Sequence, residues 1–402
     1  MKTFQCTCTD KPILFFESNQ CLNCAKTVGI DDSFDRVEPY EQDAKTGLFY
    51  KALQPEIQYR KCDNNEHFNA CNGMVNLTTF IPDPANEEEV LCFGCRFNET
   101  VPDLSIVEHI PLWKKMEAAK RRALYTLKAL PIPLQNNTEN TETGLSFDFI
   151  TDRDVNDHFV SPLTGYEAVL TGHNCGHITI NLAEADDVSR SQTKHAMGER
   201  YRTLLGHFRH ELGHYYFDLI IMPTPEKQAL CKQYFGDDQL DYQEALDKHY
   251  KNGAPENWRD TFISEYATMH PYEDWAETWA HYMHIIDTLE TAQNFSITGS
   301  TSVIAEDAEE DIEEFGELNL PQDTSYFLRQ RDFNNILDTW MDFSVMLNAL
   351  NRSMGLADAY PFVLTQAVRT KLTFVHYAIH NKLHLLPKIA PTEKKKEKIS
   401  KK

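Results

Sequence analysis

The sequence LLGHFRHELGHYYFDLI, residues 204–220, decides how the rest of the chain is interpreted. Residues 210–214 within it are His-Glu-Leu-Gly-His, which matches the pattern H-E-x-x-H. Because residues four apart share one face of an α-helix, the imidazoles of His210 and His214 can bind the same metal ion. Glu211 then lies beside the metal and can accept a proton from a water molecule that zinc activates. The motif therefore predicts a helix that carries a zinc site and a general base.

A catalytic zinc usually takes three protein ligands and keeps one position open, so a third ligand is required. The segment PYEDWAETWAHYMHI, residues 271–285, carries Glu273 and Glu277 on one face of a predicted helix. Either carboxylate can bind zinc while the other orients a ligand imidazole, and the spacing does not choose between them. A third histidine ligand of the metzincin type is excluded, because Phe217 and Ile220 occupy the positions of its glycine and its histidine.

The same residues also have structural interpretations. A solvated helix face would account for Glu273 and Glu277, but Trp275 and Trp279 are interleaved with them and make the segment too apolar to be mostly exposed. His207, three residues before the motif, is interpreted as a supporting or packing residue and not as a ligand. The functional interpretation of both segments is therefore favoured.

Eight of the ten cysteines lie within the first 95 residues. In a chain without an export signal, such clustering favours metal binding over a disulfide framework. The cluster divides into two sets of four thiolates, the number that a closed tetrahedral zinc site needs, so we expect two structural zinc ions. Replacement of one thiolate by His67 is the less favoured alternative. The first set is Cys6, Cys8, Cys21 and Cys24, and the second set is Cys62, Cys71, Cys92 and Cys95.

The charge of the chain limits its partners. Lys and Arg number 39 and Asp and Glu number 61, which gives a formal net charge of −22. Proteins that bind nucleic acids or anionic membranes need a basic surface, so neither partner is expected. The apolar runs are far shorter than the roughly 20 residues of a membrane-spanning helix, and the N-terminus has no apolar export signal. We therefore expect a cytoplasmic protein.

The sequence divides into three parts. Residues 1–100 form the cysteine-bearing module, and residues 101–387 form a mostly helical domain with an acidic insertion at about 298–323. Residues 388–402 form a Lys-rich tail that is expected to be disordered. The predicted fold class is α+β, with a zinc-ribbon-like module followed by a zincin-type domain.

The pattern of apolar residues predicts several elements in the second part. The strand GHITINL precedes the zinc motif, where zinc proteases place the edge strand that pairs with an extended substrate. The predicted helices cover 111–130, 191–219, 271–292 and much of 325–384, and the predicted strands include 145–150 and 176–182.

Long phrases of the sequence resemble a bacterial family of zinc-binding metallopeptidases that carries an N-terminal zinc-ribbon domain. One departure is Cys6-Thr-Cys8, where a single residue separates two cysteines that are two residues apart in the family pattern. The phrases that carry the resemblance include CFGCRFNETVPDLS (92–105), TGHNCGHITINLAEADD (171–187), YRTLLGHFRHELGHYYFDLI (201–220) and ATMHPYEDWAETWAHYMHI (267–285).

The resemblance implies roles that the spacing leaves open. The pair of carboxylates is similar to the Glu-x-x-x-Asp/Glu arrangement of gluzincins, which implies that Glu273 is the zinc ligand and Glu277 the partner of a ligand imidazole. Some gluzincins place a tyrosine before the ligand glutamate to stabilise the oxyanion, and Tyr266 is the nearest match.

The expected function is zinc-dependent hydrolysis of a peptide or protein substrate, with one catalytic and two structural zinc ions. The sequence leaves three alternatives. A non-catalytic interaction protein would explain the ribbon, which offers a surface for a protein partner, but it would have no use for Glu211 as a base. A ribbon protein that binds nucleic acid has the wrong charge. A zinc amidohydrolase with a non-peptide substrate would use the same activated water.

Overall fold

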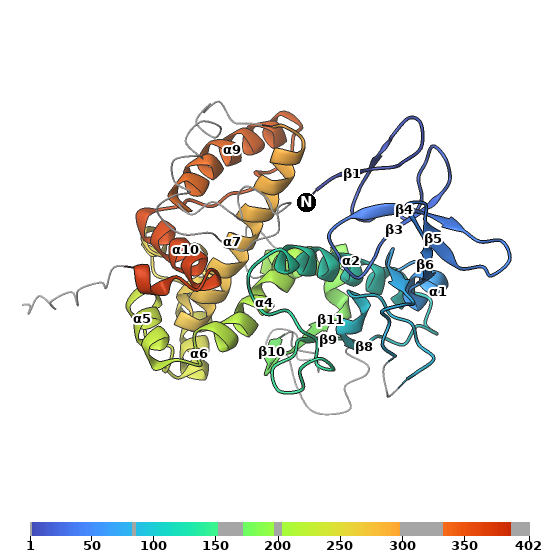
Figure 1. The fold of residues 1–402 in the computed structure, drawn as a ribbon. Helices are drawn as coiled ribbons and strands as arrows, with labels where there is room; N and C mark the ends of the chain where they lie inside the picture. The colour runs from blue at the N-terminus through green and yellow to red at the C-terminus, as the bar shows by residue number, and fades with distance from the viewer. Residues whose placement is uncertain (1, 83–85, 152–171, 197–202, 298–332, 387–402) are drawn as a thin grey trace, which may run out of the picture.

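The computed structural model describes residues 2–82, 86–151, 172–196, 203–297 and 333–386. A region of short strands precedes a largely helical region, which confirms the predicted α+β class (Figure 1). The acidic run at about 298–323 and the Lys-rich tail at 388–402 lie outside the described residues. No helix in the described part of the chain is both long enough and apolar enough to cross a membrane.

The cysteine-rich region is built from short antiparallel strands. Strand β1 (Phe4–Gln5) pairs with β2 (Ile13–Leu14), and the five strands that follow form one sheet in sequence order. A short helix, α1 (Asp63–Phe68), connects the last two of them in the sequence. The five strands are β3 (Thr27–Ile30), β4 (Val37–Gln42), β5 (Phe49–Lys51), β6 (Gln54–Lys61) and β7 (Met74–Asn76).

Helix α2 (His109–Lys128) joins the two regions (Figure 1). One of its charged side chains, Arg121, reaches the cysteine-rich region: the guanidinium donates to Oδ1 of Asn72 and lies 5.2 Å from the ring centroid of Phe16. On its other side α2 contacts helix α4 (Leu204–Ile220). The two regions therefore share one hydrophobic core around this helix.

A four-stranded mixed sheet lies beside α4, in the order β10-β11-β9-β8. The predicted strand GHITINL forms β11, but its expected position at the sheet edge is wrong, because β11 pairs with β9 on one side and β10 on the other. Cys175 and Gly176, with φ of +49° and +91°, form the tight turn that folds β10 back onto β11. The strands are β8 (Asn98–Thr100), β9 (Ser146–Ile150), β10 (Gly172–Asn174) and β11 (His177–Asn181).

The helix predicted over 191–219 is wrong as a single element, because α3 (Asp187–Ala196) and α4 are separate. Thr203 has extended backbone angles, and its hydroxyl accepts a hydrogen bond from the amide of Gly206, which is an N-cap that starts α4 anew. Helix α7 (Pro271–Asn294) begins as predicted, with Pro271 in its first turn. The remaining α-helices among the described residues are α5 (Pro225–Phe235), α6 (Tyr242–Asn252), α9 (Phe333–Ser353) and α10 (Gln366–Ile379), of which α5 and α6 were not predicted.

Helices α4 and α7 pack closely because Gly213 has no side chain. A Cβ added there would lie 2.9 Å from Cα of Ala276, which is closer than such atoms can approach. The indole nitrogen of Trp275 donates to the Gly213 carbonyl at 2.8 Å, and Trp279 stacks on Tyr216. This close approach brings the carboxylates at the start of α7 against the histidines of α4.

Candidate metal centres

Two histidines of α4 and one carboxylate of α7 converge on a single point. The Nε2 atoms of His210 and His214 lie 3.1 Å apart, and Oε2 of Glu273 lies 2.9 Å and 3.3 Å from them. Tetrahedral zinc with bonds of 2.0–2.1 Å separates its ligand atoms by about 3.4 Å. All three side chains are buried. The three groups therefore fit a zinc ion.

Glu277 faces the same histidine from the other side. Its Oε1 lies 2.7 Å from Nδ1 of His210, the nitrogen that points away from the convergence point. Burial by itself raises the pKa of the Glu277 carboxyl, but the hydrogen bond and charge of His210 outweigh it and lower the pKa to about 2. An ionised carboxylate on the outer nitrogen fixes the tautomer of a metal-binding histidine. The geometry thus favours Glu273 as the ligand and Glu277 as the carboxylate that supports His210.

The expected general base lies next to these groups on α4. Glu211 is 5% exposed, and its Oε1 lies 3.5 Å from Nε2 of His207. The Nδ1 atom of His207 contacts the carboxylate of Glu184, so the imidazole lies between two carboxylates. His207 therefore supports Glu211 in this structure and does not join the three converging ligand atoms.

Tyr266 also lies beside the site. It begins a short 3₁₀ helix, Tyr266–Thr268, and its ring centroid is 5.8 Å from that of His210. Burial raises its pKa well above the usual value of 10, so the phenol stays protonated and able to donate a hydrogen bond. These properties are those expected of an oxyanion-stabilising group.

One residue of the site was missed by sequence reasoning. The hydroxyl of Tyr242 donates to Oε1 of Glu273 at 2.8 Å, although the two residues are 31 positions apart. A helix beginning at Tyr242 could have been recognised, because Asp241 and Glu244 form a D-x-x-E capping pattern and the Asp241 side chain accepts from the Glu244 amide. Nothing in the sequence near Tyr242 indicates that its hydroxyl reaches a ligand of the zinc motif.

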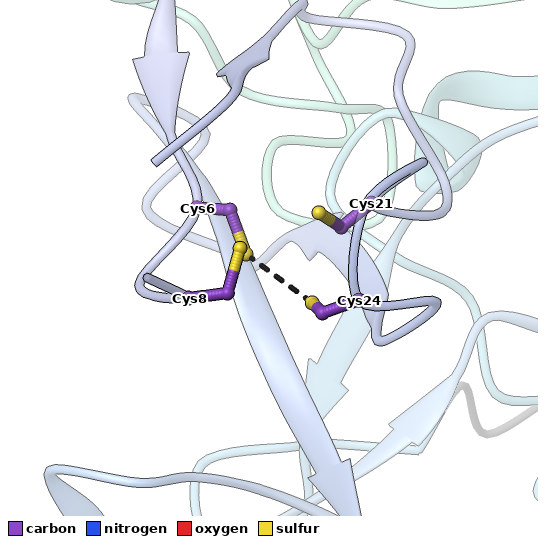
Figure 2. Close-up of side chains that lie close together, drawn as sticks. All are labelled: Cys6, Cys8, Cys21 and Cys24. Carbon is purple, nitrogen blue, oxygen red and sulfur yellow. Dashed lines mark hydrogen bonds between the residues drawn. The ribbon is translucent and has the colours of Figure 1, made fainter. Parts of the chain in front are cut away.

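The first cysteine set lies where two loops meet. Figure 2 shows Cys6 and Cys8 on one side and Cys21 and Cys24 on the other, with their sulfur atoms directed toward one another. The Sγ atoms of Cys6 and Cys24 are 3.7 Å apart, and all four lie within 4.8 Å. Zinc–sulfur bonds of about 2.3 Å separate tetrahedral sulfurs by about 3.8 Å. The one-residue spacing between Cys6 and Cys8 therefore does not prevent the four thiolates from meeting.

The second set is fully enclosed. Cys62, Cys71, Cys92 and Cys95 are all buried, with the Cys71 and Cys92 sulfurs 3.9 Å apart, and His67 is not part of the group. A Cβ added at Gly73 would lie 2.4 Å from the sulfur of Cys92, so the close packing of this site depends on glycine. All eight cysteines are free of disulfides, in agreement with the expectation of metal binding.

Comparisons with known proteins also indicate a zinc-binding protein. Residues 109–378 match a family described as "Putative zinc-binding metallo-peptidase". The chain belongs to this family. Residues 3–106, which precede this match, match a zinc-ribbon domain. The two matches confirm the resemblance seen in the sequence.

Relatives of this metallopeptidase-family protein occur in mycobacteria. An uncharacterised protein of Mycobacterium bovis and uncharacterised proteins of two Mycobacterium tuberculosis strains, CDC 1551 and H37Rv, are each 36% identical to it over 380 residues. The match covers 94% of this chain and 95% of each relative. No solved structure gives a significant match. The family and the cysteine clusters together support zinc as the metal of this protein.

Proposed function

We propose that the protein is a zinc-dependent metallopeptidase that hydrolyses peptide bonds with an activated water molecule. The observation that carries the proposal is the convergence of two Nε2 atoms and one carboxylate oxygen at the helix that carries Glu211. Among the described residues, this group offers three ligands, His210, His214 and Glu273. A structural zinc usually has four protein ligands, whereas a catalytic zinc has three and an open position. The three-ligand group therefore favours catalysis over a purely structural site.

Each side chain has a defined task in this proposal. Zinc, when bound, would lower the pKa of a water molecule and polarise the substrate carbonyl. Glu211 would accept a proton from the attacking water and deliver it to the nitrogen of the departing amine. Tyr266 would donate a hydrogen bond to the oxygen that becomes negative. Glu277 would hold His210 with its Nδ1 protonated and its Nε2 lone pair directed at the metal.

A protein or peptide is the proposed substrate, and the same residues would also hydrolyse a non-peptide amide. Removal of the metal distinguishes metal-dependent cleavage by this protein from background hydrolysis. We expect a strong chelator to reduce cleavage of an unfolded protein substrate to the uncatalysed level, and stoichiometric zinc to restore it. The measurement is mass spectrometry of the peptides released before chelation, after chelation and after reconstitution. Zinc-loaded protein that cleaves a simple amide but no peptide would favour the amidohydrolase alternative.

The finer proposal is one catalytic and two structural zinc ions, one for each of the three groups. Elemental analysis of purified protein should therefore approach three zinc ions per chain. Gly73→Ala should lose one of them, because the new methyl group would overlap Cys92. Gly172→Ala is the control, since a Cβ there would meet no atom within 4 Å. A full zinc content in Gly73→Ala would contradict the description of the second cysteine site.

A further inference from the structure

Helix α6 lies outside both segments that form the proposed zinc site. None of its residues is buried, and its first residue, Tyr242, is 40% exposed. The Tyr242 hydroxyl nevertheless donates to Oε1 of Glu273, whose side chain is 3% exposed. A mostly exposed helix thus contributes one hydrogen bond to a buried carboxylate of the candidate metal centre.

We propose that Tyr242 is a positioning residue that holds Glu273 as a ligand through one oxygen only. The inference rests on the proposed function, because it takes Glu273 as a zinc ligand. The two carboxylate oxygens have different surroundings: Oε2 faces the Nε2 atoms of His210 and His214, whereas Oε1 accepts the Tyr242 hydrogen bond.

Fixing one oxygen matters because a glutamate side chain can rotate about its terminal bonds. A carboxylate that turns could present either oxygen, or both, to a metal ion. With Oε1 bound to a hydroxyl, only Oε2 of Glu273 remains directed at the histidines. Tyr242 thereby pre-organises the ligand set, and a buried charged oxygen also gains the hydrogen bond that it needs.

Contacts of the two preceding residues and of the Tyr242 ring itself hold Tyr242 in place. Asp241 caps α6, with its side chain accepting the amide of Glu244 at 2.8 Å. The residue before the cap is tied to the start of α7, because Nε2 of His270 donates to the carbonyl of Leu240 at 3.1 Å. The ring of Tyr242 also packs against the ring of His270, with centroids 5.4 Å apart. The tyrosine is therefore held relative to the first turn of α7, where Glu273 lies.

The test is zinc affinity, which needs no substrate. Tyr242→Phe keeps the ring and removes the hydroxyl, so we expect the affinity for the catalytic zinc to fall by roughly 10–100-fold. Tyr216→Phe is the matched control, because it removes a hydroxyl that donates to the carbonyl of Pro133 over the same 2.8 Å. The control should lower the melting temperature without changing zinc affinity.

The measurement is a competitive-chelator titration of the full-length proteins, in which the catalytic zinc is identified as the ion lost from Glu273→Gln. If Glu273→Gln loses this ion and Tyr242→Phe binds it as tightly as the unmodified protein, the role of Tyr242 is refuted while the ligand set stands. If Glu273→Gln keeps all its zinc, the ligand assignment fails and the inference fails with it. Equal losses of affinity in Tyr242→Phe and Tyr216→Phe would show a general effect of lost stability and would also overturn the proposal.

Discussion

Replacement of Glu211 by Gln is expected to leave the protein folded and loaded with zinc but to lower its turnover by at least about 10²–10⁴-fold. Glutamine has the size of glutamate and the same helix propensity, so the packing of α4 should persist. An amide cannot accept a proton from water, so the chemical step loses its base. The converging ligand atoms belong to His210, His214 and Glu273, so metal binding should not depend on Glu211.

The Glu211→Gln experiment requires three measurements on one preparation: zinc content, melting temperature and turnover on a cleavable peptide. Glu226→Gln on α5 is the matched control, because it makes the same chemical change at an exposed position. The control should match the unmodified protein in all three. Unchanged turnover in Glu211→Gln would contradict the proposed role of this carboxylate, and loss of zinc would move it into the ligand set.

The second large effect distinguishes the two carboxylates of α7. Glu273→Gln should abolish tight binding of the catalytic zinc, because a neutral amide oxygen replaces the charged oxygen that faces both Nε2 atoms. Glu277→Gln should weaken zinc binding by roughly 10–100-fold, because the carboxylate holds only the outer nitrogen of His210.

Competitive-chelator titration of Glu273→Gln and Glu277→Gln measures this difference directly. The reverse order would assign the ligand role to Glu277. Equal, small losses would mean that neither carboxylate binds the metal and that the two histidines hold it with a ligand still to be found. Both variants keep the size of the side chain, so the packing of α7 is the same in each comparison.

The sequence predicted the members of the site better than their arrangement. The four-residue spacing placed His210 with His214, and Glu273 with Glu277, because that spacing is a property of any α-helix. The choice between the carboxylates depends on how α7 rotates against α4, and that rotation is set by the packing of Gly213 against Ala276. Such contacts between helices have no local signal in the sequence.

Residues outside the motifs were harder to predict for a related reason. Tyr242 reaches the site only because α6 folds back toward α7, and no residue of its helix is buried. The break before α4 depended on Thr203 acting as an N-cap within a pattern that otherwise favoured one continuous helix. The N-cap at Thr203 therefore decided where α4 begins, although the apolar periodicity indicated one continuous helix.

The junction helix α2 illustrates the same limit. Its sequence is rich in Lys and Arg and looks like a surface helix, yet the side chains of Lys120 and Glu117 are fully buried and form an ion pair of 2.9 Å. The Glu117 carboxylate also accepts from the side chain of Asn98 at 2.8 Å. Burial of these charges requires the cysteine-rich region as a partner, and the sequence of the helix alone cannot reveal that partner.

The central claim is that this chain hydrolyses peptide bonds with a water molecule that Glu211 deprotonates. Incubation of a complex peptide mixture with zinc-loaded protein in H₂¹⁸O tests it most directly, because hydrolysis places one water oxygen in each new C-terminal carboxylate. We predict new C-termini that carry one ¹⁸O with the unmodified protein and none above background with Glu211→Gln. An absence of new termini with fully zinc-loaded protein, or equal labelling with Glu211→Gln, would contradict the account.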